Sequence, residues 1–179
     1  MLDNQLIALT ISTIIAGEAT ANIPGLPIKQ AFQPTLQGVN TQPTAYMYKI
    51  GDKRFGTVHR SDVWNNDIPA MVHTETQQYE TTFQISALAT QDPKNTSAYT
   101  ASDIINLVAS ILQSSTAIAN LQANGVGIER VTEVRNPYFV DDRQQNEANP
   151  SFDFTLTHKQ IITSTTPIIE STEFQILTV

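Results

Sequence analysis

The chain has 179 residues, which suits one domain with an adequate hydrophobic core; 40% of its residues are hydrophobic and only 15% are charged. It has 10 Lys and Arg against 17 Asp and Glu, a formal net charge of −7. An acidic chain without a basic run is a poor candidate for a nucleic-acid-binding protein, because Lys and Arg supply most of the affinity for the phosphates. The absence of cysteine excludes disulfides and thiolate chemistry.

The N-terminal segment predicts a helix over residues 2–20. Apolar residues recur there at helical spacing, and Asp3 and Asn4 suit the positive end of a helix dipole. The segment lacks the basic start of a signal peptide, and no run reaches the roughly 18 apolar residues of a membrane span. We therefore expect a soluble, cytosolic protein with no membrane partner. The predicted apolar stripe consists of Leu2, Leu6, Ile7, Leu9, Ile11, Thr13, Ile14 and Ile15.

Two alternating segments flank an unusual insert. After a short strand predicted at 28–32, residues 44–50 and 80–89 alternate in the manner of half-buried strands. Residues 54–79 lie between them and contain the only Trp, two His and a Pro. A connection this long inside a compact domain is usually functional or disordered, and its aromatic content argues against disorder. We predict a protruding β-hairpin arm over about 54–79.

The second half predicts one more helix and further strands. Thr100 is placed to cap the helix, with Asp103 three residues later in a capping-box arrangement, and the pattern continues to Leu121. Asn124 and Gly125 then end the helix. Strands are predicted over 127–135, 151–161 and 172–177, with a long acidic loop over 136–150. The predicted buried helix face consists of Ile104, Leu107, Val108, Ile111 and Leu112.

This order of elements predicts an α+β fold. The sheet is expected to be mainly antiparallel, with two helices packed on one face and the arm protruding from it. We expect the chain, residues 1–179, to form a single domain.

Residues with catalytic or metal-binding chemistry are scattered. His59, His73 and His158 have no partner at the spacing of a metal-ligand pair, so surface or interface histidine is the ordinary interpretation. Asp141 and Asp142 could hold a cation or act as paired carboxylates, but adjacent acids in a polar loop are usually solvated. The chain also lacks a nucleophile elbow and a phosphate loop. We predict no enzyme activity, cofactor or metal.

Four aromatic residues admit two interpretations. Phe55 and Trp64 lie in the predicted arm, and Tyr138 and Phe139 follow a predicted strand. Each could seal the edge of its own core, or each could anchor a subunit interface, where aromatic residues are enriched. The arm favours the interface, because an aromatic hairpin on a lone monomer would be an exposed liability.

The layout, together with several short motifs, resembles the neck and tail-terminator (gateway) proteins of long-tailed bacteriophages. The resemblance covers nearly the whole chain and is architectural, with loose motifs. In chain order, the motifs are IPGLP at 23–27, PTAYMY at 43–48, FQI at 83–85, TASD at 100–103, VRNP at 134–137 and FDFTL at 152–156.

The resemblance implies a structural role in the virion neck. Such proteins form a ring, usually a hexamer, that caps the finished tail tube and stops its polymerisation. The ring also joins the tail to the head–tail connector, and the genomic DNA passes through its lumen without specific binding. The implied partners are further copies of the chain, the tail-tube protein, connector or adaptor proteins and the sheath protein, with assembly in the host cytoplasm. The candidate contacts are Phe55, His59, Arg60, Trp64, Tyr138, Phe139, Asp141, Asp142 and Arg143.

Two alternatives remain from the sequence. A tail-tube or head-completion protein of the same virion would use a similar strand-rich domain. A small metal-dependent hydrolase would use Asp141, Asp142 and a histidine.

Overall fold

A computed structural model describes residues 1–20, 25–30, 43–89, 94–140 and 146–167, and the side chains of 20, 138–140 and 146–148 lie outside this description. Helices and strands follow one another in runs along the chain, as expected for an α+β protein. The elements are α1 (Asp3–Thr20), β1 (Ile28–Gln30), β2 (Thr44–Asn65), β3 (Ala70–Leu88), α2 (Ala101–Leu112), α3 (Ser115–Ala123), β4 (Gly127–Val131), β5 (Tyr138–Val140), β6 (Asn146–Ala148) and β7 (Ser151–Pro167).

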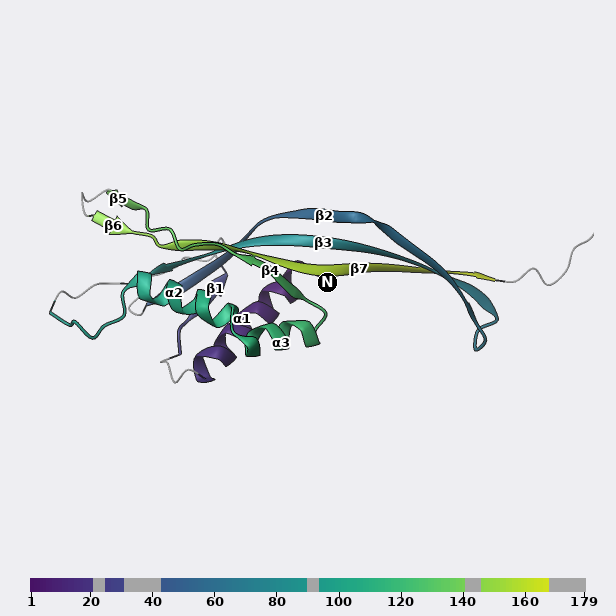
Figure 1. Ribbon diagram of the computed structural model, residues 1–179, viewed down its shortest axis with the longest axis horizontal. Helices are drawn as coiled ribbons and strands as arrows, with labels where there is room; N and C mark the ends of the chain where they lie inside the picture. Colours follow the sequence, from purple (N-terminus) through teal and green to yellow (C-terminus); the bar gives the residue numbers. More distant parts are fainter. Residues whose placement is uncertain (21–24, 31–42, 90–93, 141–145, 168–179) are drawn as a thin grey trace, which may run out of the picture.

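The main sheet has five strands in the order β1-β2-β3-β7-β4. Its strand pairs are antiparallel except for β1 and β2, which run parallel. The three helices cover one face of this sheet, and β2, β3 and β7 continue beyond them (Figure 1). A separate two-stranded hairpin, β5–β6, lies at the other end of the body. The predicted α+β class and the mainly antiparallel sheet are confirmed.

The core lies between the sheet and the helices. Phe83 of β3 and Phe154 of β7 are fully buried and face each other in register, with ring centroids 5.5 Å apart. A fully buried side chain of this size contributes about 1.5–3 kcal/mol of hydrophobic stabilisation. The predicted alternation of β3 and β7 is confirmed, because their core-facing residues are Phe83, Ile85, Ala87, Phe152, Phe154 and Leu156.

Helix α1 presents its predicted stripe with two differences. Leu6 and Ile14 are fully buried, whereas Leu2 and Ile15 are 71% and 50% exposed. Leu2 lies before the first residue of the helix, whereas Ile15 lies within the helix at an exposed position. Gly17 allows close packing, since a Cβ at this position would lie 2.3 Å from Cγ2 of Ile111 in α2.

The second helix begins as predicted but ends early. Thr100 accepts a hydrogen bond from the Asp103 backbone N–H at 3.1 Å, and its own N–H donates to the Asp103 carboxylate at 2.9 Å. The continuous helix predicted to Leu121 is wrong, because Ser114 adopts an extended backbone and caps a separate helix by accepting from the Ala117 N–H. The hydroxyl thus competes with the helical backbone, and α3 is bent by 57° from α2.

The outer face of the sheet is polar. Gln84 of β3 donates to Asp153 of β7 at 2.7 Å, and Tyr48 of β2 donates to Gln84. Arg135 closes this cross-strand ladder with an ion pair to Asp153 at 2.6 Å. The polar side chains of these strands thus lie on the outer face of the sheet, and the apolar core lies on the opposite face, under the helices.

Several strand boundaries differ from the sequence-based prediction. The predicted strand 127–135 ends at Val131, although Arg135 forms an isolated bridge with Ser151. The predicted loop 136–150 contains the β5–β6 pair. β7 extends beyond the predicted end at residue 161 to Pro167, and the strand predicted at 172–177 lies outside the described residues.

Candidate interaction surface

The predicted hairpin is present, and a third strand lies beside it in the arm. Residues 54–79 are the outer halves of β2 and β3 with their connecting turn, and residues 158–167 of β7 run antiparallel to β3 throughout. We use the term arm for these two stretches of chain. The arm projects away from the helices (Figure 1). A long sheet outside the core presents both of its faces to other molecules.

The arm carries most of the exposed large apolar side chains in the described part of the chain. Near its tip Trp64 pairs with Met71, and these side chains are 45% and 43% exposed. Apolar residues gathered on one projecting element indicate an interaction site, whereas isolated ones do not. The exposed apolar residues of the arm are Phe55, Val58, Val63, Trp64, Ile68, Met71, Ile161 and Ile162.

Charged residues on one face of the arm are already paired within it. Arg60 contacts Glu75 at 2.8 Å, and His73 contacts Asp62 at 2.6 Å and Glu75 at 3.5 Å. The hydrogen bond to Asp62, followed by that to Glu75, raises the pKa of His73, while the bond from Arg60 lowers the pKa of Glu75. His59 is exposed and points to the opposite face from Arg60, because side chains alternate along a strand.

A second polar network ties the base of the arm to α1. Lys49 of β2 contacts Asp3 of α1 at 2.8 Å and also pairs with Asp52. Asp52 accepts from Thr81 at 2.7 Å, and the Thr81 hydroxyl lies 3.0 Å from Nε2 of His158. Burial opposes ionisation of Asp52, but the bonds from Lys49 and Thr81 outweigh it and lower the Asp52 pKa.

His158 sits in this network as a largely neutral imidazole. Burial, the largest cause, lowers its pKa below the usual value, and Tyr79 stacks against its ring. Its Nδ1 is buried without a hydrogen-bond partner in the described structure. A neutral ring suits this position better than an imidazolium ion would, because a buried charge costs more than a buried neutral group.

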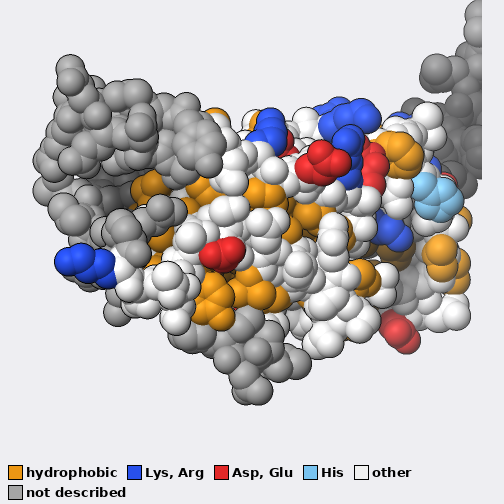
Figure 2. Space-filling model, turned by 60° about the vertical axis from the view of Figure 1, so that its left-hand side comes forward, with side chains coloured by type: hydrophobic (Ala, Val, Ile, Leu, Met, Phe, Trp, Pro, Cys, Tyr) orange, Lys and Arg blue, Asp and Glu red, His pale blue; other side chains and the backbone are white. Residues whose placement is uncertain are grey.

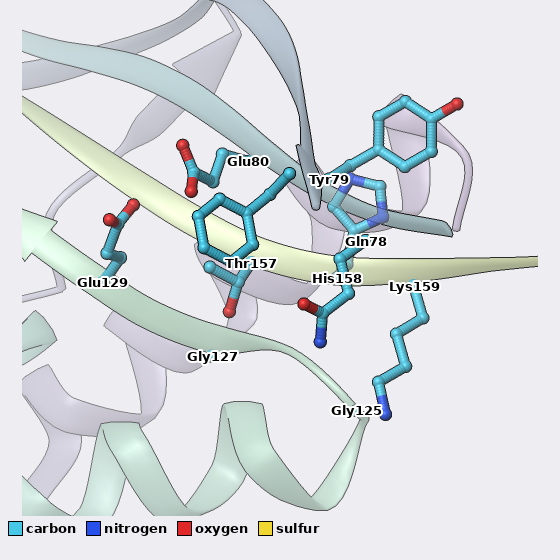
Figure 3. Close-up of a pocket in the computed structure, with 10 residues that line it drawn as sticks. Gln78, Tyr79, Glu80, Gly125, Gly127, Glu129, Thr157, His158 and Lys159 are labelled. Atoms are coloured by element: carbon cyan, nitrogen blue, oxygen red, sulfur yellow. The ribbon is translucent and has the colours of Figure 1, made fainter. Parts of the chain in front are cut away.

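A hollow of about 390 Å³ lies where the arm joins β4. Figure 3 shows the carboxylates of Glu80 and Glu129 next to each other, while Tyr79 and His158 lie together farther along the strands. Phe55 also lines this hollow. The combination of two acids with an aromatic ring suits a cationic or apolar side chain of a partner better than an anion.

The predicted contact residues fall in two separate places. Phe55, His59, Arg60 and Trp64 lie together on the arm. Tyr138 and Phe139 form part of β5, at the other end of the body, where they pair in register with β6. The remaining predicted contacts, Asp141, Asp142 and Arg143, lie outside the described residues.

The sequence-based prediction missed the contribution of β7 to this surface. Ile161 and Ile162 are 61% and 59% exposed on the arm. The available signal was the pair of adjacent isoleucines followed by the polar run TSTTP. Adjacent residues on a strand point to opposite faces, so the two isoleucines could not both face the core.

The described residues contain no group of three or more His, Asp or Glu side chains that could hold a metal ion. His59 and His73 lie on the arm, and His158 lies at its base. Within the described ranges no single helix has the length and composition of a membrane span, although α2 and α3 together pass that test as a bent pair.

The fold and its surface define an α+β assembly protein, in which a small core domain supports an apolar arm. Residues 5–168 match the family described as E217 gateway protein gp29, and the chain therefore belongs to this family. It is a structural protein of the bacteriophage neck. The family resemblance seen in the sequence is confirmed. No curated protein matches the chain at a significant level.

Proposed function

We propose that the protein forms a closed ring of six copies in the phage neck. This ring caps the tail tube. The ring stops tube polymerisation and joins the tail to the head–tail connector. Family membership supports a place in the neck. The observation that carries the ring is the arm, whose exposed apolar residues extend well outside the core of a single copy. A surface of this kind is stabilised by contact with a neighbouring subunit.

The position of the arm suits a cyclic assembly. A ring uses heterologous contacts, in which one surface of each copy meets a different surface of the next. The two outer edges of the arm, on β2 and on β7, are such a pair of unlike surfaces. The apolar tip, with Trp64 and Met71, would supply the anchor residues, since aromatic side chains dominate interface energetics.

The second predicted contact region is proposed to meet a different partner. The β5–β6 hairpin lies at the end of the body away from the arm, and residues 141–143 stand between β5 and β6 in the sequence. We assign this end to the tail tube or the connector. A ring with subunit contacts on one element and partner contacts on another can close before it docks.

The charge of the protein is compatible with DNA passage. Each copy carries a net charge of −7. Most of the surface visible in Figure 2 is uncharged, and basic and acidic side chains occur close together on it. A lumen without a basic lining would let DNA slide, because phosphate contacts from Lys and Arg are what hold nucleic acid in place.

Negative-stain electron microscopy with a solution mass measurement tests the ring. The wild-type protein is expected to give single closed rings. Trp64→Ser with Met71→Ser should shift the mass toward monomer, whereas Ile15→Ser, which changes a 50% exposed residue on α1, should not. Long cylinders from the purified protein would contradict the terminator proposal and indicate a tube subunit instead.

A further inference from the structure

Within the part of the chain that the structure describes, the outer edge of β7 has no partner strand along the arm. In the body this edge is covered by β4, and the pair nearest the arm joins Gly127 of β4 to Thr157 of β7. Beyond that pair β7 continues to Pro167, held only by β3 on its inner side among the described residues. The open stretch, 158–167, is roughly 33 Å long at about 3.3 Å per residue. Unpaired backbone N–H and C=O groups on such an edge form a template for another strand.

Beyond Lys159, this edge lacks the usual protection against pairing. Residues 160–167, QIITSTTP, contain no charged residue, and Pro167 occurs only at the end. Proteins normally protect exposed edges with charges, bulges or an early proline. An unprotected edge of this length on a soluble protein is expected to be covered in the working assembly.

The opposite edge of the arm, on β2, has a different character. A register shift between Phe55 and His59, with Gly56 at φ 68°, interrupts its inner part. From His59 to Asn65 the strand is regular. Its charged residues there, Arg60 and Asp62, already have partners on β3, so a neighbouring strand would not have to neutralise them.

We propose that the free edge of β7 binds the regular part of the β2 edge of a second copy of this chain, head to tail. This inference rests on the proposed ring and names the contact that closes it. Pairing of β7 with β7 would give a two-fold dimer that leaves both β2 edges open, and pairing of β2 with β2 would likewise leave both β7 edges open. Only the unlike pair continues from copy to copy until a ring closes.

The absence of cysteine makes disulfide mapping the direct test. Ser61 on β2 and Thr163 on β7 are both in register with Thr74 of β3, so they lie on one face and two strands apart. That separation, roughly 9.5 Å, exceeds the about 4.4–6.8 Å between Cα atoms that a disulfide spans. The double variant Ser61→Cys/Thr163→Cys can therefore bridge only between copies. A second double variant, Ser61→Cys/Thr165→Cys, covers a shift in register.

The expected result is a ladder of covalent multimers, ending at the mass of the ring, from at least one double variant after oxidation. Each single-cysteine variant should give almost none. Efficient dimers from Thr163→Cys alone would show β7–β7 pairing and overturn the proposal. Cross-links that form only after the chain is cut at Pro167 would also overturn it, because residues 168–179 would then be the natural occupant of the edge.

Two further outcomes separate this inference from the ring itself. Closed rings that never cross-link in either double variant would leave the ring standing and overturn the edge pairing. A chain that stays monomeric at the highest soluble concentration would overturn both as properties of the free protein.

A charge-blocking variant provides an independent readout. Thr163→Lys/Thr165→Lys places two cations on the free edge and should abolish the ring mass without changing the thermal unfolding of the monomer. The matched control Gln113→Lys/Gln122→Lys adds the same charge at two exposed positions, the C-cap of α2 and a site within α3, and should assemble normally. Equal assembly of both variants would contradict the proposal.

Discussion

Tyr79 stacks on His158 where the arm leaves the body, with ring centroids 5.7 Å apart and planes inclined by 13°. The two residues are direct cross-strand partners on β3 and β7. Through Thr81 the imidazole also connects to the polar network that reaches α1. These side chains therefore link the base of the arm to the body, and the effect of their protonation can be tested.

Acidification is expected to destabilise the protein through His158. Burial lowers the folded-state pKa of His158 below its unfolded value of about 6.5. The contribution of His158 to the free energy of unfolding is thus intact above about pH 6.5. It is lost as the pH falls through the folded-state pKa, because the unfolded chain binds the proton more readily. Replacement by Asn should flatten this acid-side loss in urea unfolding measured between pH 5 and 8. His59→Asn, at an exposed position on the arm, should retain the wild-type pH dependence.

His73 is expected to show the opposite sign. The hydrogen bonds to Asp62 and Glu75 raise its folded-state pKa, so its stabilising effect is present below about pH 6.5 and disappears as the pH rises through the raised value. The effect is local to the arm, so amide hydrogen exchange of arm residues is the suitable measurement. Wild-type arm amides should be better protected than those of His73→Asn at pH 6, and the two should converge at alkaline pH. A difference independent of pH would show that the imidazole acts only through its shape.

Local patterns allowed much of the core to be predicted from the sequence. The capping box at Thr100 and Asp103 depends on residues three apart, and the alternation of Phe152, Phe154 and Leu156 depends on one strand facing a core. Such signals do not require knowledge of distant partners. They were sufficient for the α+β class and for the presence of an arm.

Features that depend on distant pairing were not visible in the sequence. The end of β7, residues 162–167, is a polar run whose strand conformation follows from its register with β3. The break at Ser114 was hidden because the apolar pattern continues through it to Leu121. Periodicity reports which residues are buried, whereas it does not report whether a capping hydroxyl interrupts the backbone. The candidate surface was therefore predicted only for the β2 and β3 part of the arm.

Gly17 is expected to be required for the contact between α1 and α2. A methyl group there would lie 2.3 Å from Cγ2 of Ile111, and overpacking of this kind typically costs about 1–3 kcal/mol. This exceeds the roughly 1 kcal/mol that Ala gains over Gly in a helix, so Gly17→Ala should lower the unfolding free energy. The cost should shrink in an Ile111→Ala background, which removes the clashing atom. Gly25→Ala, with no atom within 4 Å of its new methyl group, is the matched control.

Loss of the cap at Thr100 should destabilise the protein in a pH-dependent way. The Thr100 side chain satisfies the Asp103 N–H, and Thr→Ala at such a cap costs about 1 kcal/mol. Hydrogen bonds from the Thr100 side chain and backbone also lower the pKa of Asp103. The ionised Asp103 therefore adds to the free energy of unfolding above its unfolded pKa of about 3.9, and this addition is lost as the pH falls through the lowered folded-state pKa. Urea unfolding should therefore show a larger cost for Thr100→Ala at pH 7 than at pH 2.5. Thr116→Ala, at an exposed position within α3, should be nearly neutral at both. An equal cost at the two pH values would show that the Asp103 charge plays no part in the cap.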